Sequence, residues 1–134
     1  MKIEGSCHCG KIAYQAEVDP DTLAICHCTD CQTLTGSAYR ATIPAPAETF
    51  KLLRGEPKIY LKTADSGRQR AHGFCADCGT PIYAAAPVNP TVYSIRLGTI
   101  KQRAQFSRPK RQIWCRSALP WSMDLSAIEK FGQQ

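Results

Sequence analysis

Seven of the eight cysteines in this chain fall into three short clusters. Thiolates that stand one or two residues apart can reach a common tetrahedral ion, whereas a disulfide between such close neighbours is strained. A zinc ion with four protein ligands is structural, and one with three keeps a position open for water or substrate. Because four cysteines from seven leave three, the sequence predicts two zinc ions, one closed and one available for chemistry. The clusters are Cys7 and Cys9, then Cys26, Cys28 and Cys31, then Cys75 and Cys78.

The first and last clusters share the form of a zinc knuckle, because Gly10 and Gly79 directly follow their second cysteines. Glycine at that position allows a positive φ, which lets backbone N–H groups turn towards the sulfurs and stabilise their charge. Two knuckles from distant parts of a chain usually share one ion. We therefore expect one structural zinc ion to be held by Cys7, Cys9, Cys75 and Cys78.

The middle cluster has no following glycine and precedes a predicted helical turn over residues 29–34, with Thr29 as its cap. The N-terminus of a helix favours thiolate over thiol. Zinc at this point would lower the pKa of a bound water, or hold an incoming thiol as the thiolate that attacks an electrophilic carbon. We predict that the catalytic residues, which are also the ligands of the open zinc site, are Cys26, Cys28 and Cys31.

Other interpretations of these residues stay open. Cys115 or a histidine could close the middle site, although Cys115 lies in a strand-like pattern, where a lone cysteine is more often a small buried hydrophobic residue. His8 and His27 each stand between two cysteines and are expected to point away from the ligands. His72 is expected to be an ordinary strand residue. The same cysteine spacings can also hold an iron–sulfur cluster, but distant knuckles with following glycines favour zinc.

The elements that must position these cysteines are mostly strands. Within residues 11–18, apolar side chains occupy every second position, which is the period of a half-buried strand. A short apolar segment follows over 23–26, and further strands are expected over 38–43, 49–53, 58–62, 69–74, 82–85, 92–97 and 113–117. Turns are expected at 44–46, 54–57, 65–67 and 89–90, and short helical turns at 29–34 and 126–131. The sequence thus predicts one mainly β domain over residues 1–134, a sandwich or barrel-like fold with little helix.

The chain is basic, with 17 Lys and Arg against 11 Asp and Glu and a net charge of +6. Such a balance can attract nucleic acid or an anionic substrate. No patterned basic helix or aromatic-interleaved stripe is present, so we interpret these residues as a solvated surface and do not expect nucleic acid as a partner. Many of the basic residues come late in the chain: Arg96, Lys101, Arg103, Arg108, Lys110, Arg111 and Arg116.

The first ten residues hold no apolar run, so no secretory signal is expected. The apolar stretch over 81–88 is too short to cross a bilayer, and no membrane partner is expected. We therefore expect the protein in the cytoplasm, where reduced cysteine clusters bind metal or act in catalysis.

Three motifs together carry a resemblance to a known family: residues 5–10, residues 26–32 with 35–38, and residues 74–80. They resemble the glutathione-dependent formaldehyde-activating enzyme family, which includes domains of the centromere-protein-V type. Segments 97–99, 113–114 and 119–121 are similar to later motifs of that family. The resemblance implies an Mss4-like zinc-bearing β fold. It also implies that the first and last clusters hold the structural zinc and the middle cluster the catalytic one.

The resemblance further implies a carbon–sulfur lyase that joins a thiol such as glutathione to a small aldehyde such as formaldehyde, giving S-hydroxymethylglutathione. An alternative is a non-catalytic module in which both metals hold shape and the basic surface binds nucleic acid or protein. The enzyme is the favoured hypothesis, because a purely structural role does not explain a remainder of three thiolates.

Overall fold

The computed structural model describes residues 1–133, which form two β-sheets and one α-helix, α1 (Thr29–Thr35). The strands are β1 (Lys2–Ser6), β2 (Ala13–Glu17), β3 (Ala24–Cys26), β4 (Arg40–Pro46), β5 (Lys51–Arg54), β6 (Lys58–Thr63), β7 (Gln69–Phe74), β8 (Pro81–Ala85), β9 (Val92–Arg96) and β10 (Arg111–Ile113). Short 3-10 helices are η1 (Pro20–Thr22), η2 (Ala47–Thr49), η3 (Leu97–Thr99), η4 (Arg103–Gln105), η5 (Cys115–Ser117) and η6 (Pro120–Met123). The predicted mainly β fold with little helix is confirmed.

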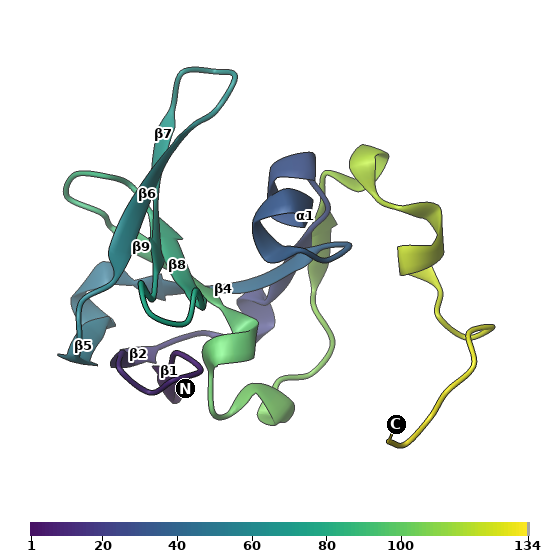
Figure 1. The fold of residues 1–134 in the computed structure, drawn as a ribbon, viewed down its shortest axis with the longest axis horizontal. Coiled ribbons are helices and arrows are strands. Elements are labelled where there is room, and N and C mark those ends of the chain that lie inside the picture. The colour runs from purple at the N-terminus through teal and green to yellow at the C-terminus, as the bar shows by residue number, and fades with distance from the viewer. Residues whose placement is uncertain (134) are drawn as a thin grey trace.

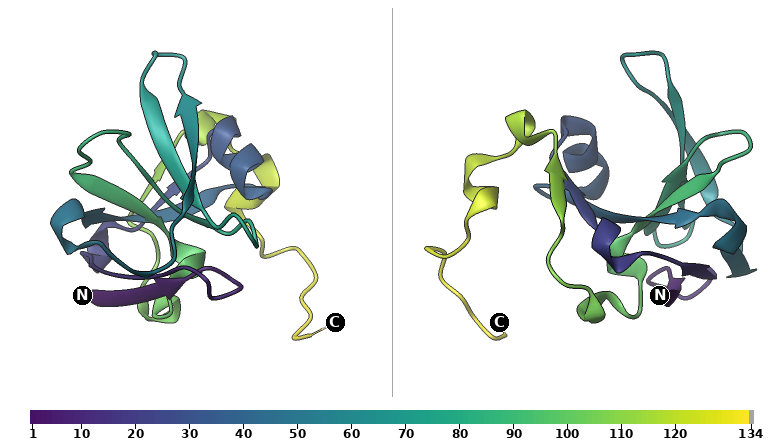
Figure 2. Two further views of the ribbon diagram at one scale, coloured as in Figure 1. Left: turned by 60° about the vertical axis from the view of Figure 1, so that its left-hand side comes forward. Right: turned by 180° about the vertical axis from the view of Figure 1, so that it is seen from behind.

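The small sheet has the strand order β1-β2-β5, and the large sheet has the order β10-β3-β4-β9-β8-β7-β6 (Figure 1). Strand pairs within residues 1–133 are antiparallel, except that β10 runs parallel to β3. The hairpin of β6 and β7 rises from the large sheet, α1 lies near β4, and the C-terminal segment, drawn in yellow, extends away from both sheets (Figures 1 and 2). No helix in the described part of the chain is long and apolar enough to cross a membrane.

The core lies between the two sheets and confirms the alternation predicted for residues 11–18. The alternating apolar side chains of that segment are buried in one cluster with residues of the large sheet such as Ile43 and Ile95. These two isoleucines are direct cross-strand partners on β4 and β9, so they face the same side of the sheet. The opposite face of the large sheet is therefore free to carry polar groups. The alternating residues are Ile12, Tyr14, Ala16 and Val18.

Two departures from the predicted strands have a clear physical reason. Strand β1 was not predicted, because its five residues include Gly5 and Ser6, which are weak strand formers. The turn predicted at 44–46 is wrong, since these residues continue β4. Pairing of β4 with β3 ends at Thr42, and residues 43–46 pair only with β9. A proline without an N–H is tolerated where one side of a strand has no partner.

The C-terminal part of the chain also differs from the prediction. The strand expected over 113–117 is instead β10, which ends at Ile113, and residues 115–117 form η5. Trp114 takes a left-handed conformation with φ 58°, which ends the strand. The helical turn expected over 126–131 is wrong as well. Ile128 and Phe131 in this segment are exposed, so no packing stabilises so short a helix.

Gly5 on β1 lies directly beneath the ring of Tyr14, its cross-strand partner on β2. A Cβ at this position would lie 2.1 Å from Cζ of Tyr14. The tyrosine cannot move aside freely, because it is fully buried and its hydroxyl is 2.6 Å from Oγ1 of Thr99. We expect Gly5→Ala to lower the free energy of unfolding by about 1–3 kcal/mol, the usual cost of overpacking. Denaturant unfolding measures this effect.

The matched control is Gly98→Ala, because a Cβ at Gly98 meets no atom of residues 1–133 within 4 Å. Equal unfolding free energies for the two variants would contradict the close packing of Tyr14 on β1.

Candidate metal centres

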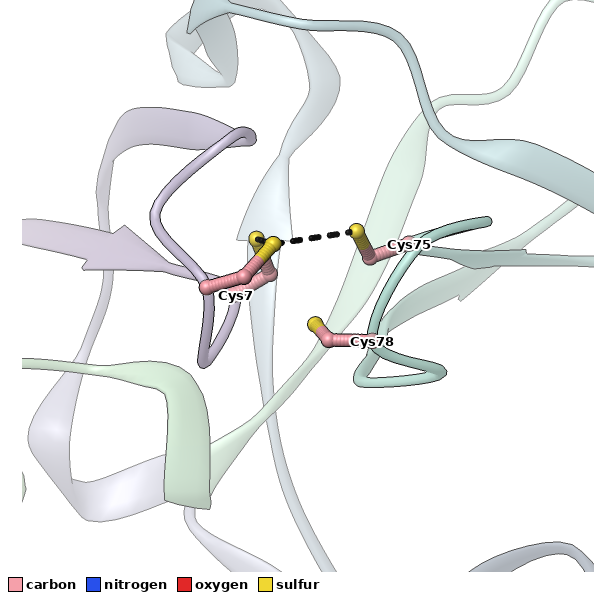
Figure 3. Close-up of side chains that lie close together, drawn as sticks. Cys7, Cys75 and Cys78 are labelled. Atoms are coloured by element: carbon pink, nitrogen blue, oxygen red, sulfur yellow. Dashed lines mark hydrogen bonds between the residues drawn. The ribbon is translucent and has the colours of Figure 1, made fainter.

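The four-cysteine group joins two loops that are far apart in the sequence. Cys7 directly follows β1 and Cys75 directly follows β7, and each loop supplies one more cysteine, Cys9 and Cys78. The four Sγ atoms all lie within 4.8 Å of one another. Figure 3 shows the side chains of Cys7, Cys75 and Cys78 converging from opposite sides. The structure therefore brings together the four residues that the knuckle pattern predicted.

The spacing of these sulfurs fits a tetrahedral ion. The Sγ atom of Cys9 lies 3.6 Å from that of Cys7 and 3.8 Å from that of Cys75. With metal–sulfur bonds of about 2.3 Å, a regular tetrahedron has edges of about 3.8 Å. Cys7 and Cys75 are both buried, so their thiolates need a compensating cation. The donors and their geometry suit zinc.

The backbone of both loops supports the sulfurs as the glycines predicted. Gly10 and Gly79 have φ values of +78° and +74°. Their N–H groups donate to the carbonyl oxygens of Cys7 and Cys75, at 3.1 and 2.8 Å. The N–H of Ile12 donates to Sγ of Cys7 at 3.2 Å. The bond from the N–H of Ile12 to the sulfur stabilises the thiolate of Cys7 and fixes its direction.

Cys78 is further stabilised as a thiolate by a residue that the sequence did not single out. The hydroxyl of Thr80 lies 3.1 Å from Sγ of Cys78. This hydroxyl, followed by the backbone N–H groups of Cys9 and Thr80, lowers the pKa of Cys78 to about 5. One sulfur of the group is thus prepared for metal at neutral pH.

The three-cysteine group comes from one short segment. Cys26 ends β3, Cys28 stands at the N-terminal cap of α1, and Cys31 lies in the first turn of the helix. Their Sγ atoms also lie within 4.8 Å of one another. The predicted cap, Thr29, is wrong, because Sγ of Cys28 accepts the N–H of Cys31 at 3.3 Å and so caps the helix itself. The same sulfur can therefore cap the helix and bind metal.

These three thiols favour a cation between them. Burial, and then the neighbouring sulfurs of Cys28 and Cys26, raise the pKa of Cys31 to about 12. Like charges so close together cannot all form unless a cation offsets them. Lys62, which forms an ion pair with Asp30 of α1, supplies one nearby positive charge.

Within residues 1–133, no fourth Cys, His, Asp or Glu joins the three-cysteine group. Cys115 is exposed in η5, so the expectation of a small buried residue in a strand is wrong. His27 is buried, and its Nε2 lies 2.7 Å from Oε1 of Gln112, so the ring is directed to an amide. His8 is exposed, and His72 lies on β7 as expected. These positions are consistent with the prediction that a metal ion in the three-cysteine group keeps one coordination position open.

The roles of several residues around the three-cysteine group are not predicted from the sequence. Gln32 on α1 donates through Nε2 to the carbonyl oxygens of His27, at 2.8 Å, and Ser117, at 2.9 Å. It ties the helix to both neighbouring segments. Arg40 and Arg96 are buried beside the group, although Arg96 was interpreted as part of a solvated surface. That interpretation is wrong because Arg96 ends β9, a strand inside the large sheet.

Fold and site together define a mainly β domain that carries one four-cysteine group and one three-cysteine group, both compatible with metal binding. Residues 2–117 match the family described as "Glutathione-dependent formaldehyde-activating enzyme". The chain belongs to this family, whose description names an enzyme that acts on formaldehyde with glutathione. The predicted resemblance is confirmed.

The fold is also similar to that of a Rhodobacter sphaeroides protein of known crystal structure. The two chains are 18% identical with a TM-score of 0.63, and the match covers 81% of this chain and 98% of that chain. At this identity the similarity shows a shared fold.

Proposed function

We propose that this chain is a single-domain zinc enzyme, a carbon–sulfur lyase that adds a thiol such as glutathione reversibly to a small aldehyde such as formaldehyde. The supporting observation is the group of three sulfurs that no fourth ligand within residues 1–133 closes, in a chain that belongs to this family. In this proposal Cys26, Cys28 and Cys31 hold the catalytic zinc. The structural zinc is held by Cys7, Cys9, Cys75 and Cys78.

A zinc ion in the three-cysteine group would supply a Lewis acid that keeps a thiol ionised at neutral pH. In the addition, the sulfur–carbon bond forms while the π bond of the aldehyde carbonyl breaks, and the thiol proton ends on the new hydroxyl oxygen. The chain contributes orientation. Capping of α1 by Cys28 fixes the direction of that sulfur, and Gln32 holds the helix against the segment that carries Ser117.

The proposal is tested by NMR exchange spectroscopy on the zinc-loaded protein with glutathione and formaldehyde. We expect exchange between glutathione and S-hydroxymethylglutathione to be faster than the uncatalysed reaction and proportional to protein concentration. Cys115→Ser is the matched control, because it removes an exposed cysteine outside both groups and should keep full activity.

An exchange rate equal to the uncatalysed background, with two zinc ions bound per chain, would refute this function. The colour of the protein also separates zinc from the alternative cluster, since a zinc protein is colourless and an iron–sulfur protein is brown.

A further inference from the structure

Arg40 and Arg96 are buried on the same face of the large sheet. Arg40 is 4% exposed and Arg96 is 7% exposed. Arg96 is the direct cross-strand partner of Thr42, and Arg40 lies two residues from Thr42, so both arginine side chains leave the sheet on one face. Cys26 is in turn the direct partner of Arg40 on the neighbouring strand β3. The two arginines therefore stand next to the three-cysteine group.

Neither guanidinium has a carboxylate partner within residues 1–133. The four ion pairs of the described chain involve other residues. Nε and Nη2 of Arg40, and Nε of Arg96, are enclosed and donate to no acceptor in the part of the chain that the structure describes. Nη2 of Arg96 lies 3.1 Å from Nδ1 of His72, a neutral acceptor. Burial, and then the charge of Arg96, lower the pKa of His72 to about 4. A buried charge without a counter-ion is strongly unfavourable.

The metal centre alone does not balance these charges. Three thiolates and one divalent cation carry a net charge of −1, whereas two guanidinium groups carry +2. Burial, and then the charge of Arg40, lower the pKa of Arg96 to about 9, which still leaves it protonated at neutral pH. A further negative charge is needed on this face of the sheet.

A cavity of about 780 Å³ lies against both arginines and offers the space for such a charge. It reaches from Cys7 of the four-cysteine group to Thr35 at the end of α1, and none of the three cysteines of the open group lines it, whereas the two arginines lie against both the cavity and that group. Lys101 and Arg103 also line it, and its described wall contains no Asp or Glu. Glu4, outside the wall, neutralises Lys101 at 2.9 Å. The cavity is far larger than a one-carbon aldehyde needs, and its volume is typical of sites for drug-sized ligands.

We propose that Arg40 and Arg96 bind a carboxylate of the thiol substrate, and thereby select thiols that carry a carboxylate at a distance from the sulfur. This inference rests on the proposed function for the identity of the substrate as a thiol. Guanidinium groups suit the task, because they are charged at neutral pH and donate charge-assisted hydrogen bonds to carboxylate.

The test measures binding of S-methylglutathione to the zinc-loaded full chain by titration calorimetry. This probe keeps both carboxylates but has no free thiol, so its binding does not depend on catalysis. We expect Arg40→Met and Arg96→Met each to weaken binding about 10- to 100-fold, the range expected for losing charge-assisted hydrogen bonds. Arg96→Lys should lose less. Arg108→Met, at an exposed position outside the cavity, should bind as the wild type does.

A second arm uses the unaltered protein, so that it does not depend on the folding of a variant. The diethyl ester of S-methylglutathione, which has no free carboxylate, should bind the wild type as weakly as the acid binds Arg96→Met. Esterification should then have little further effect on Arg96→Met.

Three results would overturn the proposal. The first is that S-methylglutathione does not bind measurably to the wild type, and the second is that the acid and its diethyl ester bind with equal affinity. The third is that the arginine variants lose zinc from the three-cysteine group but keep full affinity for the probe. The last result would show that the arginines only offset the thiolates. Carboxylate-dependent binding without any acceleration of hemithioacetal exchange would retain this site and refute the proposed function instead.

Discussion

Replacing Cys75 with serine is expected to abolish the cooperative folding of this protein. Cys75 is buried directly after β7, and its sulfur lies against the cysteines that follow β1. Structural zinc sites contribute about 10–16 kcal/mol of apparent binding free energy, whereas whole domains are stable by about 5–15 kcal/mol. Losing one of four thiolates therefore removes a contribution as large as the net stability. Circular dichroism during heating should show no sharp transition for Cys75→Ser.

Cys115→Ser is the matched control for this experiment as well, because it has the same chemistry at an exposed position. It should unfold at the temperature of the wild type and keep its zinc. If Cys75→Ser melted as sharply and at the same temperature as this control, the four-cysteine group would have no role in stability, and a metal shared between β1 and β7 would be excluded.

Cys31→Ser is expected to remove activity while leaving the fold in place. The three-cysteine group lies at the junction of β3 and α1, outside the core between the sheets. Two remaining thiolates hold a metal weakly, so zinc should fall from two ions to one per chain. Changes to groups that only support a metal ligand already cost about 10- to 100-fold in activity or affinity. We therefore expect the rate of hemithioacetal exchange to fall by more than about 100-fold, to the uncatalysed value.

The same substitution, cysteine to serine, is expected to have different effects on folding in the two cysteine groups. Cys31→Ser should keep a sharp thermal transition and one zinc ion, whereas Cys75→Ser should lose the transition. Zinc analysis, melting and NMR exchange on both proteins give the comparison. Full exchange activity in Cys31→Ser would show that the open group is not the catalytic site. Loss of folding in Cys31→Ser would show that both groups are structural.

The cysteine groups were predictable because their geometry is largely local. Residues two or three positions apart in a turn bring their side chains together in almost any fold, and a following glycine marks the turn that makes this possible. The positive φ values of Gly10 and Gly79 are the direct outcome of that pattern. The strand over residues 13–17 was predictable for a similar reason, since alternation of apolar side chains is a property of the strand itself.

The neighbours of the sulfurs were not predictable in this way. Cys28 caps the helix in place of Thr29 because its sulfur accepts a backbone N–H. Residue preferences assign this role to Ser, Thr, Asp or Asn, so the sequence pointed to Thr29. The course of β4 through Pro44 and Pro46 depends on where β3 stops pairing. The helix cap and the length of β4 both depend on which atoms a segment contacts in the folded chain. The residues of the segment alone do not predict these contacts.

By itself the sequence determined the mainly β fold, the two groups of four and three sulfurs, and the family. Only the tertiary structure decided that Arg40 and Arg96 share one buried face beside Cys26, with a cavity that holds no acidic side chain in its described wall. The physical reason is strand register. Residues 56 positions apart in the sequence become neighbours through hydrogen bonds between strands, and the register of those bonds decides which side chains face each other.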